Sequence, residues 1–116
     1  MLDLKNYNYL FYDFETTGQN PCFDQAVRLA IIETDNQFNI VNKHNIDIKL
    51  RNDILPHPKA LLVNKLNIDD LNSGNNEYES FKKIHKIFNQ PNKISIGYNS
   101  LSFDDKFLRF GFYRNL

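Results

Sequence analysis

The sequence is poor in cysteine, in net charge and in long apolar runs. Its single cysteine, Cys22, permits no disulfide within the chain, which favours a reducing, cytoplasmic setting. Fourteen basic and fourteen acidic side chains cancel, which argues against a general basic surface for nucleic acid. The composition still allows nucleic acid to bind locally, through bound metal ions and a few Arg or Lys side chains. No apolar stretch approaches the ~18 residues of a membrane span, and residues 1–5 lack the pattern of a signal peptide. We expect no contact with a membrane.

The length and the remaining composition indicate one folded domain. A chain of 116 residues is long enough for one modest core and too short for two. Hydrophobic residues make up 41% of the chain and include ten Phe and six Tyr, which is typical of a folded protein and not of a disordered one.

The apolar pattern predicts an α/β fold that opens with a three-stranded antiparallel meander. Strands are expected over residues 8–14, 26–34 and 39–50, with a turn at 35–37. Asp and Asn tolerate turn geometry, and short connections join antiparallel strands.

The rest of the chain predicts an α-β-α arrangement. Two short helices are expected, then a long helix, a strand and a last helix, over residues 58–63, 68–71, 76 or 77 to about 91, 94–98, and 102 or 103 to about 115. The long helix is expected to carry one stripe of Phe81, Ile84, His85, Ile87 and Phe88, and the last helix an apolar side of Phe107, Phe110, Phe112 and Tyr113. A meander followed by α-β-α is the front half of a ribonuclease-H-like fold. In that fold the fourth strand pairs beside the first and brings residues 98–99 and the last helix near Asp13.

Asp13 and Glu15 form a pair of carboxylates at the end of the first strand. Residues two apart in a strand share one face, so these side chains project together and repel. A hard divalent cation would relieve that repulsion. An arbitrary Asp-x-Glu more often lies on a solvated face. The aromatic run 9–12 before the pair indicates a buried strand, and the tight exit 16–18 after it could present N–H groups to a phosphate.

Asp104 is a third candidate ligand, expected in the first turn of the last helix. The helix dipole alone would explain an isolated acidic residue there. With Asp13 and Glu15, however, it would complete an oxygen-rich pocket built from two elements that the fold brings together. Phe14 lies on the opposite face of the strand and is expected in the core.

Five segments carry a family resemblance that covers almost the whole chain. They are Phe-Tyr-Asp-Phe-Glu-Thr-Thr-Gly at 11–18, residues 24–39, Leu-Pro-His-Pro-Lys-Ala-Leu-Leu-Val at 55–63, Gly-Tyr-Asn-Ser-Leu-Ser-Phe-Asp-Asp at 97–105 and Phe-Tyr-Arg-Asn at 112–115. The chain resembles the DEDD superfamily of 3′→5′ exonucleases and, within it, the bacterial exodeoxyribonuclease I family. The resemblance implies the release of 5′-mononucleotides from single-stranded DNA, in DNA repair and recombination, with two Mg²⁺ or Mn²⁺ ions in the complete enzyme.

The resemblance also assigns roles to residues. Asp13, Glu15 and Asp104 match the catalytic metal ligands, and the residues matched to substrate contacts are Glu15, Thr16, Thr17, Asn99 and Arg109. Turn chemistry would also explain the two threonines, a helix cap would explain Asn99, and a solvated side chain would explain Arg109.

One family feature is missing from these 116 residues. The family takes its general base and fourth acidic ligand from a later His-x-x-x-x-Asp motif. Here the residues five positions after His44, His57 and His85 are Lys49, Leu62 and Gln90, so all three histidines are expected to be surface or packing residues. We therefore interpret residues 1–116 as the N-terminal portion of an exonuclease domain, truncated at the C-terminus and nearly inactive alone, since losing a positioned base costs ~10²–10⁴-fold.

Other functions stay open on the sequence alone. The chain could be a non-catalytic fragment that binds single-stranded nucleic acid, an RNA-directed DEDD exonuclease, or a non-functional remnant. For the full-length enzyme we expect a monomer whose partners are single-stranded DNA and a single-stranded-DNA-binding protein.

Overall fold

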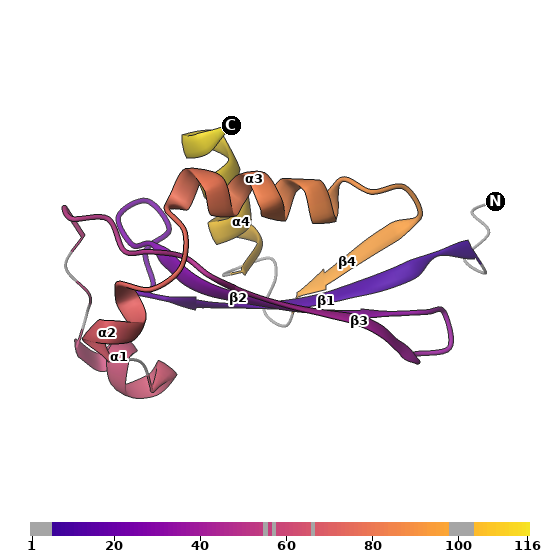
Figure 1. Ribbon diagram of the computed structural model, residues 1–116, viewed down its shortest axis with the longest axis horizontal. Helices are drawn as coiled ribbons and strands as arrows, with labels where there is room; N and C mark the ends of the chain where they lie inside the picture. Colours follow the sequence, from indigo (N-terminus) through magenta and orange to yellow (C-terminus); the bar gives the residue numbers. More distant parts are fainter. Residues whose placement is uncertain (1–5, 55, 57, 66, 98–103) are drawn as a thin grey trace.

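The computed structural model describes residues 6–54, 56, 58–65, 67–97 and 104–116, and it has the expected order of elements (Figure 1). In chain order these are β1 (Asn8–Thr16), β2 (Ala26–Thr34), β3 (Ile40–Asp47), α1 (Pro58–Asn64), α2 (Ile68–Leu71), α3 (Glu77–Phe88), β4 (Lys93–Gly97) and α4 (Asp105–Asn115). In the part of the chain that is described, no helix is long and apolar enough to cross a membrane.

The strands form one sheet in the order β3-β2-β1-β4. The first three strands pair antiparallel, as the predicted meander requires, and β4 runs parallel to β1. The turn between β2 and β3 is held by Asp35, whose carboxylate accepts hydrogen bonds from the backbone N–H groups of Gln37 and Asn39. The parallel pairing of β4 with β1 confirms the prediction that the fourth strand lies beside the first.

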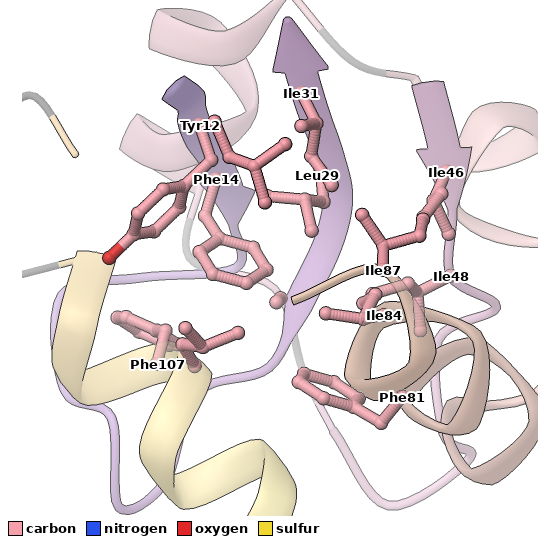
Figure 2. Packing of buried hydrophobic residues seen from close by; sticks show 13 residues of the cluster. Tyr12, Phe14, Leu29, Ile31, Ile46, Ile48, Phe81, Ile84, Ile87 and Phe107 are labelled. Atoms are coloured by element: carbon pink, nitrogen blue, oxygen red, sulfur yellow. The ribbon is translucent and has the colours of Figure 1, made fainter. Parts of the chain in front are cut away.

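The core lies between one face of this sheet and the helices α3 and α4, which pack over it (Figure 1). Alternate residues of β1 to β3 point toward α3 and α4, as their twofold period requires. Figure 2 shows these side chains meeting Phe81, Ile84 and Ile87 of α3 and Phe107 of α4. Phe14 is buried, as expected. The helices α1 and α2 lie at one end of the sheet, close to the end of β1 (Figure 1).

The opposite face of the sheet, called here the outer face, keeps apolar side chains partly exposed. Tyr9 and Phe11 are only half-buried, and the ring of Phe38 stacks on that of Tyr9 with centroids 5.4 Å apart. Ile32 and Ile96 are 39% and 38% exposed. Strand β1 is therefore an interior strand of the sheet, as the aromatic run indicates, but only one of its faces, with Leu10 and Tyr12, is fully buried among the described residues.

Three element boundaries differ from the prediction. Strand β1 continues to Thr16, two residues beyond the expected end, and β4 begins at Lys93. Strand β3 ends at Asp47 instead of residue 50, because Ile48 bridges to Asn75 and the chain turns toward α2. The predicted start of the last helix at 102 or 103 and the end of the fourth strand at residue 98 fall outside the described residues.

The packing faces of the two long helices also differ in part. In α4, Phe107 is buried as expected, but Phe110 and Tyr113 are 37% and 79% exposed. The helix contacts α3 through Gly111, where a β-carbon would collide with the ring of Phe81. In α3, the expected apolar stripe is correct except for His85, which is exposed.

Candidate functional site

The site lies along the edge of β1, past the part of the strand that pairs with β4. In the described residues that pairing runs to Tyr12 and Gly97, and beyond it the first residues of α4 lie beside β1. There the backbone N–H of Phe14 donates a hydrogen bond to Oδ1 of Asp104, at 3.3 Å. A carboxylate 90 positions away in the sequence is thereby brought beside the strand that carries Asp13 and Glu15.

The three carboxylates differ in burial and influence one another. Asp13 is exposed, Glu15 is half-buried and Asp104 is only 1% exposed. Burial raises the pKa of Glu15, and the charges of Asp13 and Asp104 raise it further, while Arg28 opposes them. Burial also raises the pKa of Asp104, against the hydrogen bond from Phe14 and with a further contribution from Asp13. A cation between these groups would offset both burial and mutual repulsion.

The donor set fits a hard divalent cation, since Asp13, Glu15 and Asp104 offer only carboxylate oxygens. Within residues 6–54, 56, 58–65, 67–97 and 104–116, no three His, Cys, Asp or Glu side chains lie close enough together to hold a metal ion as they stand. The carboxylates thus share one neighbourhood and one electrostatic environment, and their role as metal ligands stays a prediction.

Tyr12 belongs to the core and lies near these carboxylates. Its hydroxyl points toward the beginning of α4 (Figure 2). Burial, with added contributions from Asp105 and Asp104, raises the pKa of Tyr12 to about 12. The phenol therefore stays neutral at ordinary pH and adds no further negative charge beside the carboxylates.

The loop that leaves β1 is fixed by its own hydroxyl groups. Thr16 donates from Oγ1 to the carbonyl of Gly18 at 2.6 Å, and Thr17 donates from Oγ1 to Oδ1 of Asp24 at 3.0 Å. Oγ1 of Thr17 also accepts a hydrogen bond from the backbone N–H of Gln25. Both threonines are buried, so their hydroxyls serve the turn, and substrate contact at these positions stays a prediction.

A cavity of about 530 Å³ opens between this loop and α1. Helix α1 is fastened to the end of β1 by Asn64, whose side-chain amide donates to the carbonyl of Thr16 at 2.9 Å. The cavity is lined by Thr16, Gly18, Gln19, Asp24, Lys59, Ala60, Val63 and Asn64. One of the lining residues, Thr16, directly follows Glu15 in the chain.

The remaining predicted contacts lie apart from this cavity. Arg109 is an exposed residue of α4 that pairs with Asp105 at 3.5 Å, one helical turn earlier. Asp104 is the N-cap residue of α4 and not part of its first turn, and Asp105 is half-buried. Asn99 and His57 lie outside the described residues. His44 is half-buried, and His85 contacts Phe112 edge to face.

Sequence reasoning missed Arg28 and Asp47. Arg28 is the direct cross-strand partner of Glu15 on one side and of Asp47 on the other. Its Nε donates to Oδ1 of Asp47 at 2.6 Å. Counting back from the turn at residues 35–39 would pair Arg28 with Ile46, and only the register shift between Glu33 and Thr34 brings Asp47 opposite it. Pairing Arg28 with Glu15 likewise required the register across the loop 17–25.

Comparison with known proteins shows the family to which this chain belongs. The chain belongs to the exonuclease family, which it matches over residues 10–116. It is 39% identical over 109 residues to exodeoxyribonuclease I of Buchnera aphidicola subsp. Baizongia pistaciae, a match that covers 92% of this chain and 23% of that relative.

Solved structures show the same fold. Escherichia coli exonuclease I in complex with a dT13 oligonucleotide has a TM-score of 0.89 and 35% identity, over 94% of this chain and 24% of that one. The zinc-ion-bound form of the E. coli enzyme with single-stranded DNA has a TM-score of 0.90 and 34% identity, over 95% and 24%. The chain thus spans about a quarter of the length of the relatives it matches, and its ribonuclease-H-like α/β fold is confirmed.

Proposed function

We propose that the chain provides part of the catalytic site of a metal-dependent 3′→5′ exonuclease that releases 5′-mononucleotides from single-stranded DNA. The observation that carries the proposal is the hydrogen bond from the Phe14 N–H to Asp104. It brings the third carboxylate of the family motif to the strand that bears the first two. Membership of the exonuclease family supports the same reaction class.

Asp13, Glu15 and Asp104 would hold the metal. Bound divalent cations supply an activated water and stabilise the charge of the leaving oxygen in phosphodiester hydrolysis. The zinc-bound E. coli structure supports a divalent cation, and we propose Mg²⁺, which favours carboxylate oxygens. Tyr12 stays neutral beside the site, and the buried Thr16–Thr17 turn holds the strand end rigid.

The substrate and partners follow from the relatives. The E. coli enzyme was solved with a single-stranded oligonucleotide, and we propose single-stranded DNA as the substrate here. Another similar structure is a complex of exonuclease I with SSB-Ct, with a TM-score of 0.91, which supports a single-stranded-DNA-binding protein as partner. We propose that the enzyme is a monomer that acts in DNA repair and recombination.

The activity of the 116 residues alone should be low. They hold no His-x-x-x-x-Asp motif, so the base that would activate water is not among them. We expect cleavage ~10²–10⁴-fold below that of an enzyme with a positioned base. A 3′-labelled DNA strand and a matched RNA strand, incubated with the chain and Mn²⁺, measure both the activity and the preference for DNA.

Calorimetric titration with Mn²⁺ tests the metal site itself. We expect the wild-type chain to bind Mn²⁺ and Asp13→Asn to bind it at least tenfold more weakly, since one charged ligand is lost. Asp53→Asn is the matched control, because Asp53 is 78% exposed and outside the site, and it should bind like the wild type. Equal affinity in Asp13→Asn and wild type would refute the assignment.

A further inference from the structure

The residue that the geometry singles out beyond the carboxylates is Arg28. It lies on β2 between Glu15 of β1 and Asp47 of β3, as the direct partner of both. Directly opposed residues hold their β-carbons about 5 Å apart on one face of the sheet. The outer face therefore carries a row of an acidic, a basic and an acidic side chain, and the first of them, Glu15, is a proposed metal ligand.

Arg28 is held in place by one neighbour and acts electrostatically on the other. Its Nε is bound by Asp47 at 2.6 Å, with side chains 32% and 36% exposed, so the guanidinium is docked and still meets solvent. Hydrogen bonding to Asp47 raises the pKa of Arg28, and Glu15 contributes to the same shift. The reciprocal effect on Glu15 is that Arg28 opposes the rise in its pKa.

We propose that Arg28, docked on Asp47, is a positioning residue that acts through the charge of Glu15 and lowers the affinity of the carboxylate site for divalent cations. This inference rests on the proposed function, since it takes Glu15 as a metal ligand. A fixed positive charge beside a metal ligand competes with the cation for its carboxylate and repels the cation itself. Asp47 partly neutralises that charge and keeps it from reaching fully across to Glu15.

If the pair of Arg28 and Asp47 were only structural, its removal would have a different effect. An exposed pair of this kind contributes little to stability, commonly under ~1 kcal/mol, and its loss would leave metal affinity untouched. If Arg28 instead acts on Glu15, removing its charge must tighten metal binding, which is the opposite of what damage to the site would do.

Mn²⁺ affinity in matched variants of the chain is the test, read by calorimetry or by the paramagnetic effect of Mn²⁺ on water protons. We expect Arg28→Gln to bind Mn²⁺ about three- to tenfold more tightly than wild type, from one partly screened charge removed. Arg28→Lys keeps the charge and should bind within about twofold of wild type. Asp47→Asn should bind more weakly, because Arg28 is then released toward Glu15. Circular dichroism of each variant verifies the fold.

The outcomes separate this inference from the proposed function. If wild type binds Mn²⁺ and a folded Arg28→Gln variant binds it equally well or more weakly, the role of Arg28 is overturned and the metal site stands. Binding by Arg28→Gln where wild type shows none would support the role directly. Absence of binding in both would overturn the inference together with the metal site.

Discussion

At the scale of single residues, a cluster of polar side chains fixes the beginning of β1 against its two neighbouring strands. At its beginning, Glu33 of β2 is buried and forms an ion pair with Lys93 of β4, across β1. Asn8 donates to the same carboxylate at 2.7 Å. Because a buried charge is tolerated only with partners, this cluster fixes the register of three strands at once.

The Glu33 cluster predicts a stability that depends on pH. Burial by itself would raise the pKa of Glu33, but the hydrogen bonds from Lys93 and Asn8 outweigh it and hold the pKa below its usual value of 4.5. A carboxyl group with a lowered pKa contributes stability above its unfolded pKa and loses it as the pH falls through the folded pKa. We expect Glu33→Gln to destabilise the fold at pH 7 by about 1–3 kcal/mol.

Urea unfolding at several pH values measures this contribution. The difference between Glu33→Gln and wild type should shrink as the pH falls through the lowered pKa of Glu33, because the wild-type side chain then also becomes neutral. Asp53→Asn, which removes a carboxylate 78% exposed, should show no such trend. A difference that stays constant from pH 7 to pH 3 would contradict the assignment.

At the scale of elements, the contact between α3 and α4 sets where Asp104 lies. Gly111 lets α4 approach Phe81, and the far end of α4 is tied down by Arg114 and Asn115, which both donate to the buried carboxylate of Glu77. Helix α4 is therefore held at its middle and its end. Its beginning, with Asp104, is held by the bond from Phe14.

Gly111→Ala tests this packing. Alanine normally stabilises a helix relative to glycine by up to ~1 kcal/mol. Here its β-carbon would meet the ring of Phe81, so we expect a net loss of about 1–3 kcal/mol in urea unfolding. Because α4 must shift to make room, Mn²⁺ affinity should also fall.

The control for that variant is Lys106→Ala, an alanine substitution at an exposed position of the same helix. It should leave both the stability and the Mn²⁺ affinity within error of wild type. A Gly111→Ala variant that is more stable than wild type would show that the helix contact is looser than described.

At the scale of the whole molecule, the sheet is covered unequally. Helices α3 and α4 pack on one face (Figure 1). On the outer face, Tyr9, Phe11, Ile32 and Phe38 leave an apolar surface. Surfaces of this kind promote association. We expect the isolated chain to be monomeric only at low concentration.

Two substitutions on the outer face should suppress association without loss of stability. Phe38 is 65% exposed and has φ of 65°, a left-handed conformation that asparagine adopts more readily than phenylalanine. In the double variant Ile32→Thr with Phe38→Asn, sedimentation should show a monomer at concentrations where wild type associates. Leu29→Thr, on the buried face of β2, is the contrast and should unfold the chain.

The sequence by itself determined the order of elements, the faces of its strands and the identity of the three carboxylates. Period-two alternation is a local property, so Phe14 could be assigned to the core and Asp13 to the opposite face before any fold was known. The turn at Asp35 likewise depends on residues next to one another. The family motifs then pointed to the exonuclease fold, which the comparisons confirm.

Only the tertiary structure decided which distant groups meet. The hydrogen bond from Phe14 to Asp104 depends on how α4 packs beside β1, and the row Glu15, Arg28, Asp47 depends on two strand registers. The contact of α4 with Phe81 depends on the glycine at position 111. Such contacts join residues far apart in the chain, and their geometry arises from packing of the whole core and from no local pattern.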